Sequence, residues 1–155
     1  MRGVNYELYM AAALSEARSA AQAGERPDGA VAVLDEAMVA RGREQVISSG
    51  DPTAHAVMVA VREAARRLGR PSLNGVIVFC AVEPCAMCVG ALLESDADGV
   101  VFALADADAG AAGSVMHLAN GELLPRRLVV VSGILQADAA ELRRAAGNGS
   151  TVPAR

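Results

Sequence analysis

Several stretches of the chain repeat apolar residues at offsets of three and four, which is the periodicity of an amphipathic helix. The first stretch predicts a helix over residues 7–23 that ends at Gly24. The clearest one follows Asp51, which we expect to cap a helix that starts at Pro52 and continues to Leu68. Two more helices are predicted, over Cys85–Glu94 and Ala137–Ala146. These helices need a common surface on which to bury their apolar faces.

Short apolar runs between the helices predict strands that would supply this surface. Two of the runs flank Asp35 and Glu36, a pattern typical of a hairpin. The five predicted strands are Gly29–Leu34, Ala37–Arg41, Val76–Val82, Gly99–Leu104 and Leu128–Val131. Because strands and helices alternate, we expect an α/β fold with helices packed on a mixed sheet. The predicted organisation is one domain over residues 1–146 and a flexible tail over residues 147–155.

The composition agrees with a single globular domain. The chain has 155 residues, of which 53% are apolar and 21% charged, so it can form one core but not two. Its longest apolar runs have seven residues, far below the roughly 20 that span a bilayer. Glu7 and Glu16 bracket the first run and argue against a signal peptide. We therefore expect a cytoplasmic protein with no membrane contact.

The charge balance argues against a nucleic-acid partner. The formal net charge is −4, and the aromatic residues are two tyrosines and two phenylalanines, with no tryptophan. A nucleic-acid binder needs a positive surface and aromatic side chains on which bases stack. The composition therefore predicts a small-molecule substrate.

Cys85 and Cys88 are the first sign of specific chemistry. They lie three residues apart on a predicted helix that begins after Pro84, so both sulfur atoms face the same side. Such a pair could be a redox couple, half of a structural zinc site, or part of a catalytic site. His55 would supply a third ligand and leave a fourth position open, as in catalytic zinc sites. If Cys80 or His117 closed that position, the zinc would be structural.

Three segments resemble one enzyme family. The chain reads Asp51-Pro52-Thr53-Ala54-His55-Ala56, then Glu83-Pro84-Cys85-Ala86-Met87-Cys88, then Ala109-Gly110-Ala111-Ala112-Gly113-Ser114. In this order the segments are similar to the cytidine deaminase superfamily, above all to its bacterial tRNA adenosine deaminase and guanine deaminase branches.

The resemblance implies a fold, a cofactor and a reaction. The fold is the three-layer cytidine deaminase-like fold, with a five-stranded mixed sheet flanked by helices. The cofactor is one Zn2+ on His55, Cys85 and Cys88, which activates a water that displaces an amino group from a heterocycle. The resemblance also implies a homodimer, packed through the helix face that carries Ala91, Leu92 and Leu93.

One position departs from the family pattern. The family has His-x-Glu, in which the glutamate carries the proton from the water to the leaving amine, whereas this chain has Val57 at that position. Valine cannot carry a proton, and losing a positioned acid-base group costs about 10²- to 10⁴-fold in rate. A second interpretation of Val57 is that it extends the apolar stripe of its helix.

Two acidic residues stand where the family has other residue types. Asp28 replaces the valine of a Pro-Val-Gly-Ala loop, and Glu44 replaces the asparagine of a Gly-His-Asn segment. We consider both as catalytic candidates that would take over the proton transfer. The alternatives are a polar turn for Asp28 and a solvent-facing strand end for Glu44.

The resemblance also implies residues that contact the substrate. They are Ala56, Val57, Pro84, Asp106 and His117. Relatives that edit tRNA carry basic residues near this edge of the pocket, where this chain has Ala105 and Asp108. This difference again predicts a small heterocyclic substrate.

Three functional hypotheses follow from the sequence. The first is an atypical zinc-dependent hydrolase or aminohydrolase that acts on a nucleobase-like substrate. The second is a catalytically inactive relative that binds a small molecule or a partner subunit. The third is an ordinary nucleobase or adenosine deaminase inactivated at Val57.

Overall fold

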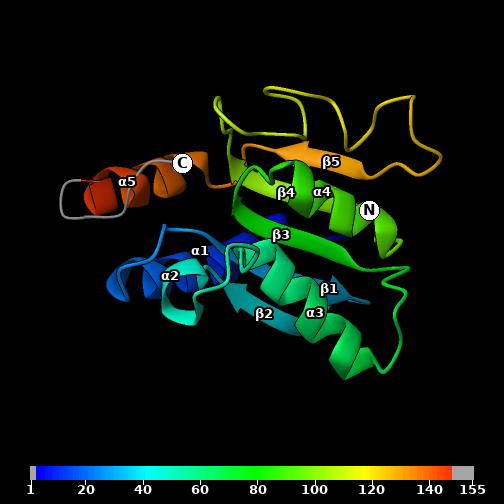
Figure 1. Ribbon diagram of the computed structural model, residues 1–155, viewed down its shortest axis with the longest axis horizontal. Coiled ribbons are helices and arrows are strands. Elements are labelled where there is room, and N and C mark those ends of the chain that lie inside the picture. The colour runs from blue at the N-terminus through cyan, green and yellow to red at the C-terminus, as the bar shows by residue number, and fades with distance from the viewer. Residues whose placement is uncertain (1–2, 148–155) are drawn as a thin grey trace.

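Five strands form one mixed sheet through the centre of the molecule (Figure 1). The computed structural model describes residues 3–147. The strand order is β2–β1–β3–β4–β5; β1 is antiparallel to β2 and β3, and β3, β4 and β5 are parallel. The strands are β1 Gly29–Leu34, β2 Ala37–Arg43, β3 Ile77–Val82, β4 Gly99–Leu104 and β5 Val129–Ser132. The predicted fold class, a five-stranded mixed sheet flanked by helices, is confirmed.

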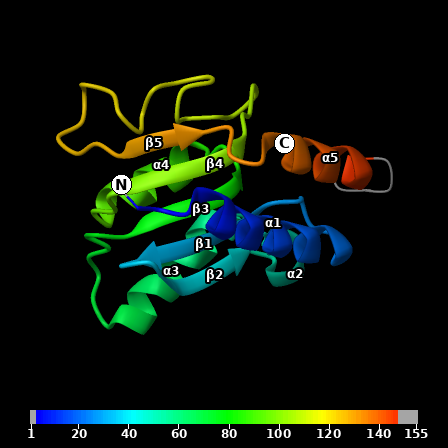
Figure 2. The same ribbon diagram turned by 180° about the vertical axis from the view of Figure 1, so that it is seen from behind.

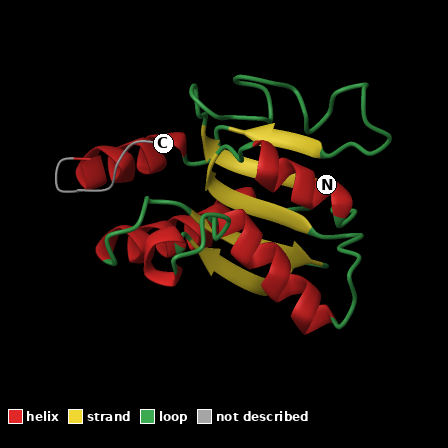
Figure 3. Cartoon of the chain, viewed as in Figure 1, coloured by secondary structure: helices red, strands yellow, loops and turns green. Residues whose placement is uncertain are grey.

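Helices cover both faces of this sheet and make three layers (Figure 3). Helices α3 and α4 lie on the face seen in Figure 1, and the view from behind in Figure 2 shows α1 on the other face. The helices are α1 Tyr6–Gln22, α2 Val46–Ser49, α3 Ala56–Leu68, α4 Ala86–Glu94 and α5 Gln136–Gly147. None of these described helices is long and apolar enough to cross a membrane.

The alternation of side chains along the central strands divides the core into two parts. Successive residues of a strand point to opposite faces, so Ala30 and Ala32 pack toward α3 and α4, while Val31 and Val33 pack toward α1. Phe79 of β3 lies fully buried under α1, within aromatic contact of Tyr9. Each fully buried valine or phenylalanine stabilises the fold by roughly 1.5–3 kcal/mol.

The start of α3 differs from the prediction. The helix begins at Ala56, with His55 as its N-cap residue, and not at Pro52. The Asp51 carboxylate accepts hydrogen bonds from the backbone N–H and the hydroxyl of Thr53, so it closes a separate turn. That Asx turn competes with helix capping for the same carboxylate, and the helix starts four residues later than expected.

Two other expectations concern the dimer face on α4 and the flexible tail. Leu92 and Leu93 of α4 are buried within their own chain, 0% and 6% exposed, so they are not available for a dimer face. The homodimer stays a prediction. The predicted tail lies outside the described residues, except for Gly147, which ends α5.

We predict that Gly42→Ala destabilises the domain by about 1–3 kcal/mol, because a Cβ at this position would lie 2.6 Å from the carbonyl oxygen of Ala56 and the amide nitrogen of Ala60. Chemical denaturation measures the change. Gly90→Ala in α4 is the control: its Cβ meets no atom within 4 Å, so the domain should keep or gain stability. Equal stability of Gly42→Ala and the parent would contradict the close packing of β2 against α3.

Candidate metal centre

The first turns of α3 and α4 bring three potential metal ligands together. His55 is the N-cap residue of α3, Cys85 is the N-cap residue of α4, and Cys88 lies one turn into α4. The Nδ1 atom of His55 is 3.5 Å from the sulfur of Cys85 and 3.5 Å from the sulfur of Cys88. All three ligand atoms lie within 4.8 Å of one another.

These separations suit a tetrahedral zinc ion. With Zn–S bonds of about 2.3 Å and Zn–N bonds of about 2.0 Å, two ligands of a tetrahedral zinc ion lie about 3.5–3.8 Å apart. Within residues 3–147 the cluster has no fourth histidine, cysteine or carboxylate. Cys80 is buried in β3, where the sequence analysis placed it in the core, and His117 is exposed on the loop between β4 and β5. The arrangement is therefore the open, three-ligand site that the sequence predicted.

The two thiols differ in acidity. A hydrogen bond from Cys88 lowers the pKa of Cys85 to about 3, and the His55 ring adds to this effect. The pKa of Cys88 is raised, first by the same hydrogen bond and then by burial. A metal ion binds thiolates, so its binding displaces the remaining proton and strengthens as the pH rises.

Two buried carboxylates lie next to this cluster, at the open end of the β1–β2 hairpin. Asp28 and Glu44 are 5% and 2% exposed, and the backbone N–H of Glu44 donates to the carbonyl oxygen of Asp28 at 3.1 Å. The Oε2 atom of Glu44 accepts a hydrogen bond of 3.4 Å from the backbone N–H of Ala56. Glu44 is therefore not a solvent-facing strand end, and its carboxylate reaches the residue that follows His55.

The Asp28 carboxylate is held in place inside the protein. Its Oδ1 atom accepts from the backbone N–H groups of Gly29 and Val82 at 2.9 and 3.1 Å. Burial raises the pKa of Asp28 to about 6; the charge of Glu44 adds to the increase, and Arg26 opposes it. Asp28 is thus an interior group that changes its protonation near neutral pH.

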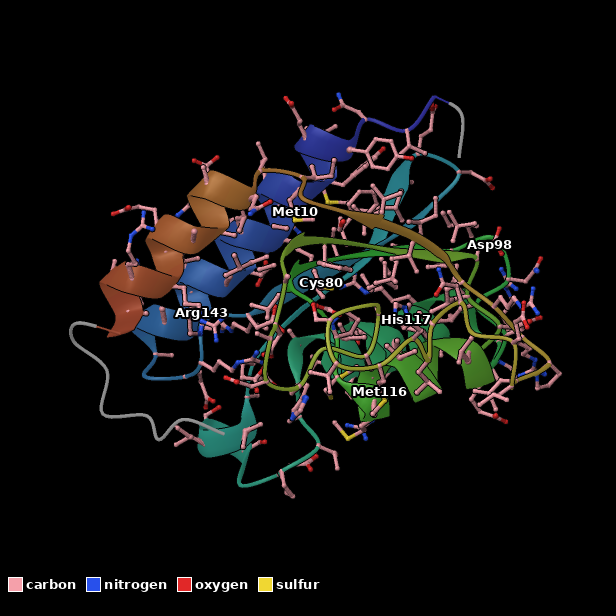
Figure 4. All side chains as sticks on the ribbon, turned by 90° about the horizontal axis from the view of Figure 1, so that it is seen from above. Met10, Cys80, Asp98, Met116, His117 and Arg143 are labelled. Carbon is pink, nitrogen blue, oxygen red and sulfur yellow. The ribbon has the colours of Figure 1, made fainter. Side chains whose placement is uncertain are left out.

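The predicted substrate contacts fall into two groups. Ala56, Val57 and Pro84 are buried around the ligands, and Val57, which is 1% exposed, packs in the core between α3 and the sheet. Asp106 and His117 lie on the loop between β4 and β5, which Figure 4 shows from above with His117 labelled. Asp106 is 6% exposed and His117 is exposed. The catalytic and substrate-binding roles of all these residues stay predictions.

Sequence reasoning missed Arg26 and Glu83. The Arg26 guanidinium lies 3.2 Å from Asp106 and 3.9 Å from Asp28, and so it links two loops beside the site. Glu83 accepts hydrogen bonds from several residues of the β4–β5 loop. Glu83 stood inside the cysteine motif, but no periodicity signals which loop a buried carboxylate will bind.

Comparison with known proteins assigns the family. Residues 4–104 match the family described as the cytidine and deoxycytidylate deaminase zinc-binding region. The chain belongs to this deaminase family. This membership and the ligand geometry confirm the zinc prediction, since the matched region is a zinc-binding one and the three predicted ligands can hold one ion.

Several relatives align with most of this deaminase-family chain and over most of their own length. The tRNA-specific adenosine deaminase of Bacillus subtilis (strain 168) is 38% identical over 130 residues, which are 84% of this chain and 81% of the relative. The guanine deaminase of the same strain is 39% identical over 111 residues, 71% of each chain. A solved structure from a study of A-to-I editing by tRNA:A34 deaminases superimposes with a TM-score of 0.84 at 32% identity, covering 87% of this chain and 98% of the other.

These relatives correct one sequence-based conclusion. The negative net charge and the few aromatic residues argue against a nucleic-acid partner, yet relatives of this similarity are named for tRNA. Net charge is a sum over the whole surface and does not report a local positive patch. A nucleic-acid substrate is therefore not excluded.

We predict one zinc ion per purified chain. Cys85→Ser should reduce the zinc content to near zero and lower the unfolding temperature, because metal binding and folding are coupled. Elemental analysis measures the content, and Cys80→Ala, which alters a buried cysteine outside the cluster, should keep one zinc ion per chain. A parent protein that holds no zinc after purification in zinc-containing buffer would refute the site.

Proposed function

We propose that this chain is a zinc-dependent aminohydrolase that acts on a nucleobase-like heterocycle and uses Glu44 as its proton carrier. The observation that carries the proposal is the buried Glu44 carboxylate, bonded to the backbone of Ala56 between the ligand His55 and Val57. This backbone segment is where the family places its glutamate. Glu44 therefore supplies, from the residue after β2, a carboxylate that residue 57 does not supply from α3.

The roles of the chain's own residues follow from this arrangement. A zinc ion on His55, Cys85 and Cys88 would supply Lewis acidity toward a water molecule at its open fourth position. Glu44 accepts a proton from the attacking water and returns it to the amino group that leaves as ammonia. The net change is the addition of water and the loss of ammonia, with no oxidant or reductant.

Asp28 has a supporting role in this proposal. Two backbone N–H groups fix its Oδ1 atom, and Arg26 lies against its Oδ2 atom. Burial raises the pKa of Asp28 to about 6, and the neighbouring charge of Glu44 adds to the increase.

A second function is supported by a different observation. Val57 is buried among core residues and leaves no proton carrier at the position that the family uses. A protein that binds zinc and a heterocycle without turning it over would look the same at this residue. Release of ammonia by the parent protein distinguishes the two functions.

We predict that Glu44→Gln lowers the rate of ammonia release by about 10²- to 10⁴-fold, since it removes a positioned proton carrier. Adenine, guanine and cytosine, as free bases and nucleosides, are the substrates to screen. The double variant Val57→Glu with Glu44→Asn restores both family residues and should be faster than Glu44→Asn alone. Zinc content and thermal unfolding show whether each variant is folded.

Three results would contradict the role of Glu44. Equal rates for the parent and Glu44→Gln would exclude it as the proton carrier. Ammonia release by the double variant alone would mean that the chain is a deaminase inactivated at Val57. Binding of a heterocycle without ammonia release by any variant would favour the second function.

The surface beside the site supports a substrate that carries phosphate. A groove of about 490 Å³ runs between β2 and α3 and reaches Ala54, the residue before His55. Arginines outnumber carboxylates two to one in its lining, although the whole chain is negative. The charged lining residues are Arg41, Arg62, Arg66, Arg67, Asp51 and Glu63. All four arginines form ion pairs, with Glu16, Asp51 or Glu63, so a phosphate group would have to replace these partners. Because arginine forks suit phosphate groups, we propose a nucleobase presented in RNA as the substrate.

We predict that Arg62→Ala combined with Arg66→Ala weakens RNA binding by about tenfold or more and reduces its salt dependence, because each lost phosphate contact lowers the salt slope by about one. Binding of a tRNA pool at two salt concentrations measures both effects. Arg143→Ala combined with Arg144→Ala on α5, outside the groove lining, is the charge-matched control. Unchanged RNA binding with both pairs would exclude the groove as the RNA contact.

A further inference from the structure

Glu83 is a buried carboxylate that binds a loop distant in sequence. It is 2% exposed and stands two residues before the ligand Cys85. Its Oε1 atom accepts from the backbone N–H groups of Ala112 and Ser114, both at 3.0 Å. Its Oε2 atom accepts from the backbone N–H of Asp106 at 3.0 Å and from the hydroxyl of Ser114. Four donors of one loop thus converge on one side chain.

The small residues of this loop make room for the carboxylate. A Cβ added at Gly110 would lie 2.3–2.5 Å from the carboxyl atoms of Glu83, so only glycine fits there. The backbone N–H of Ala111 donates to the carbonyl oxygen of Pro84 at 2.9 Å, which adds a second link to the same segment. The Gly110–Ser114 stretch that the sequence analysis noted in the third motif therefore wraps around Glu83.

This contact joins two parts of the site that come from different segments of the chain. The segment from Glu83 leads directly into α4, with Cys85 and Cys88. The loop carries Asp106 and His117, which we predict to contact the substrate. The connection is long, because β4 ends at Leu104 and β5 begins at Val129. Arg26 holds its start at Asp106 and Arg126 holds its end at Leu93 and Glu94, while Glu83 binds the part between residues 106 and 114.

We propose that Glu83 is a positioning residue that fastens the β4–β5 loop to the metal-ligand segment, so that base recognition depends on it while metal binding does not. The importance of the loop for the substrate rests on the proposed function. The fastening itself rests on the hydrogen bonds and on the fit at Gly110. These two parts can be tested separately.

The test of the fastening is hydrogen exchange of the zinc-loaded protein. Glu83→Gln replaces a carboxylate, which only accepts hydrogen bonds, by an amide. The NH2 group of this amide cannot accept hydrogen bonds from the loop donors that it then faces. We expect amide exchange in residues 105–117 to become about 10- to 100-fold faster, as the loss of hydrogen bonds to a charged acceptor implies. Exchange in α1 should not change, and the protein should keep one zinc ion per chain.

Three further variants show whether faster exchange comes from the loop alone or from a general loss of folding. Ser114→Ala removes one of the four hydrogen bonds and should give a smaller increase in the same residues. Gly110→Ala disturbs the fit from the loop side and should resemble Glu83→Gln. The matched control is Glu25→Gln: Glu25 is also buried and accepts from the backbone N–H groups of Ile47 and Ser48, so its loss should speed exchange in α2 and not in the β4–β5 loop.

The test of substrate positioning uses the substrate found in the ammonia screen. Glu83→Gln should raise KM by about tenfold or more and change kcat less, a split that a loss of folded protein would not produce, since that lowers kcat alone. An unchanged KM with a faster-exchanging loop would overturn the positioning role. Unchanged exchange in residues 105–117 would overturn the fastening. If no substrate is found, the proposed function fails, and hydrogen exchange still decides the fastening.

Discussion

Three ligand atoms from two helices have to lie within 4.8 Å of one another, and the packing of this domain makes that possible. His55 and Cys85 both occupy N-cap positions, so the first turns of α3 and α4 must meet beside the sheet. Glycine at position 42 lets the backbone of α3 approach β2, and parallel pairing of β3 with β4 leads the chain from the sheet into α4 and back. A displacement of either helix would separate the ligands, because protein interiors do not deform freely.

Buried acidic side chains organise the loops around this centre. Glu25, Asp28, Glu83 and Asp106 each accept at least two hydrogen bonds from backbone N–H groups, and each is at most 6% exposed. Burying a carboxylate is costly unless such donors replace its water, and charged acceptors give the stronger hydrogen bonds. These buried carboxylates therefore hold loops that have no strand pairing. The same loops carry residues that we predict to contact the substrate.

The proposed function depends on three residues beside the metal ligands, Val57, Asp28 and Glu44. The chain has the fold of its family and three ligand atoms that can hold one ion, and Val57 is buried in the core two residues after the ligand His55. Asp28 and Glu44 are both buried at the end of the β1–β2 hairpin, and the Glu44 carboxylate accepts a hydrogen bond from the backbone N–H of Ala56. Our proposal gives the proton transfer to Glu44 because its buried carboxylate reaches the backbone between His55 and Val57.

The amino-acid sequence alone determined the elements and the metal ligands. Short apolar runs predicted all five strands, because the central strands are buried on both faces, and apolar periodicity predicted four of the helices, because burial of one helix face imposes a period of 3.6 residues. The spacing of Cys85 and Cys88 predicted two of the three metal ligands. Only the tertiary structure decided that α3 starts at Ala56, that Glu44 is buried and that Glu83 binds a distant loop, since a carboxylate finds its donors through contacts between remote segments. The net charge gave a wrong prediction about nucleic acid for the same reason, because a sum over residues does not say where on the surface the charges lie.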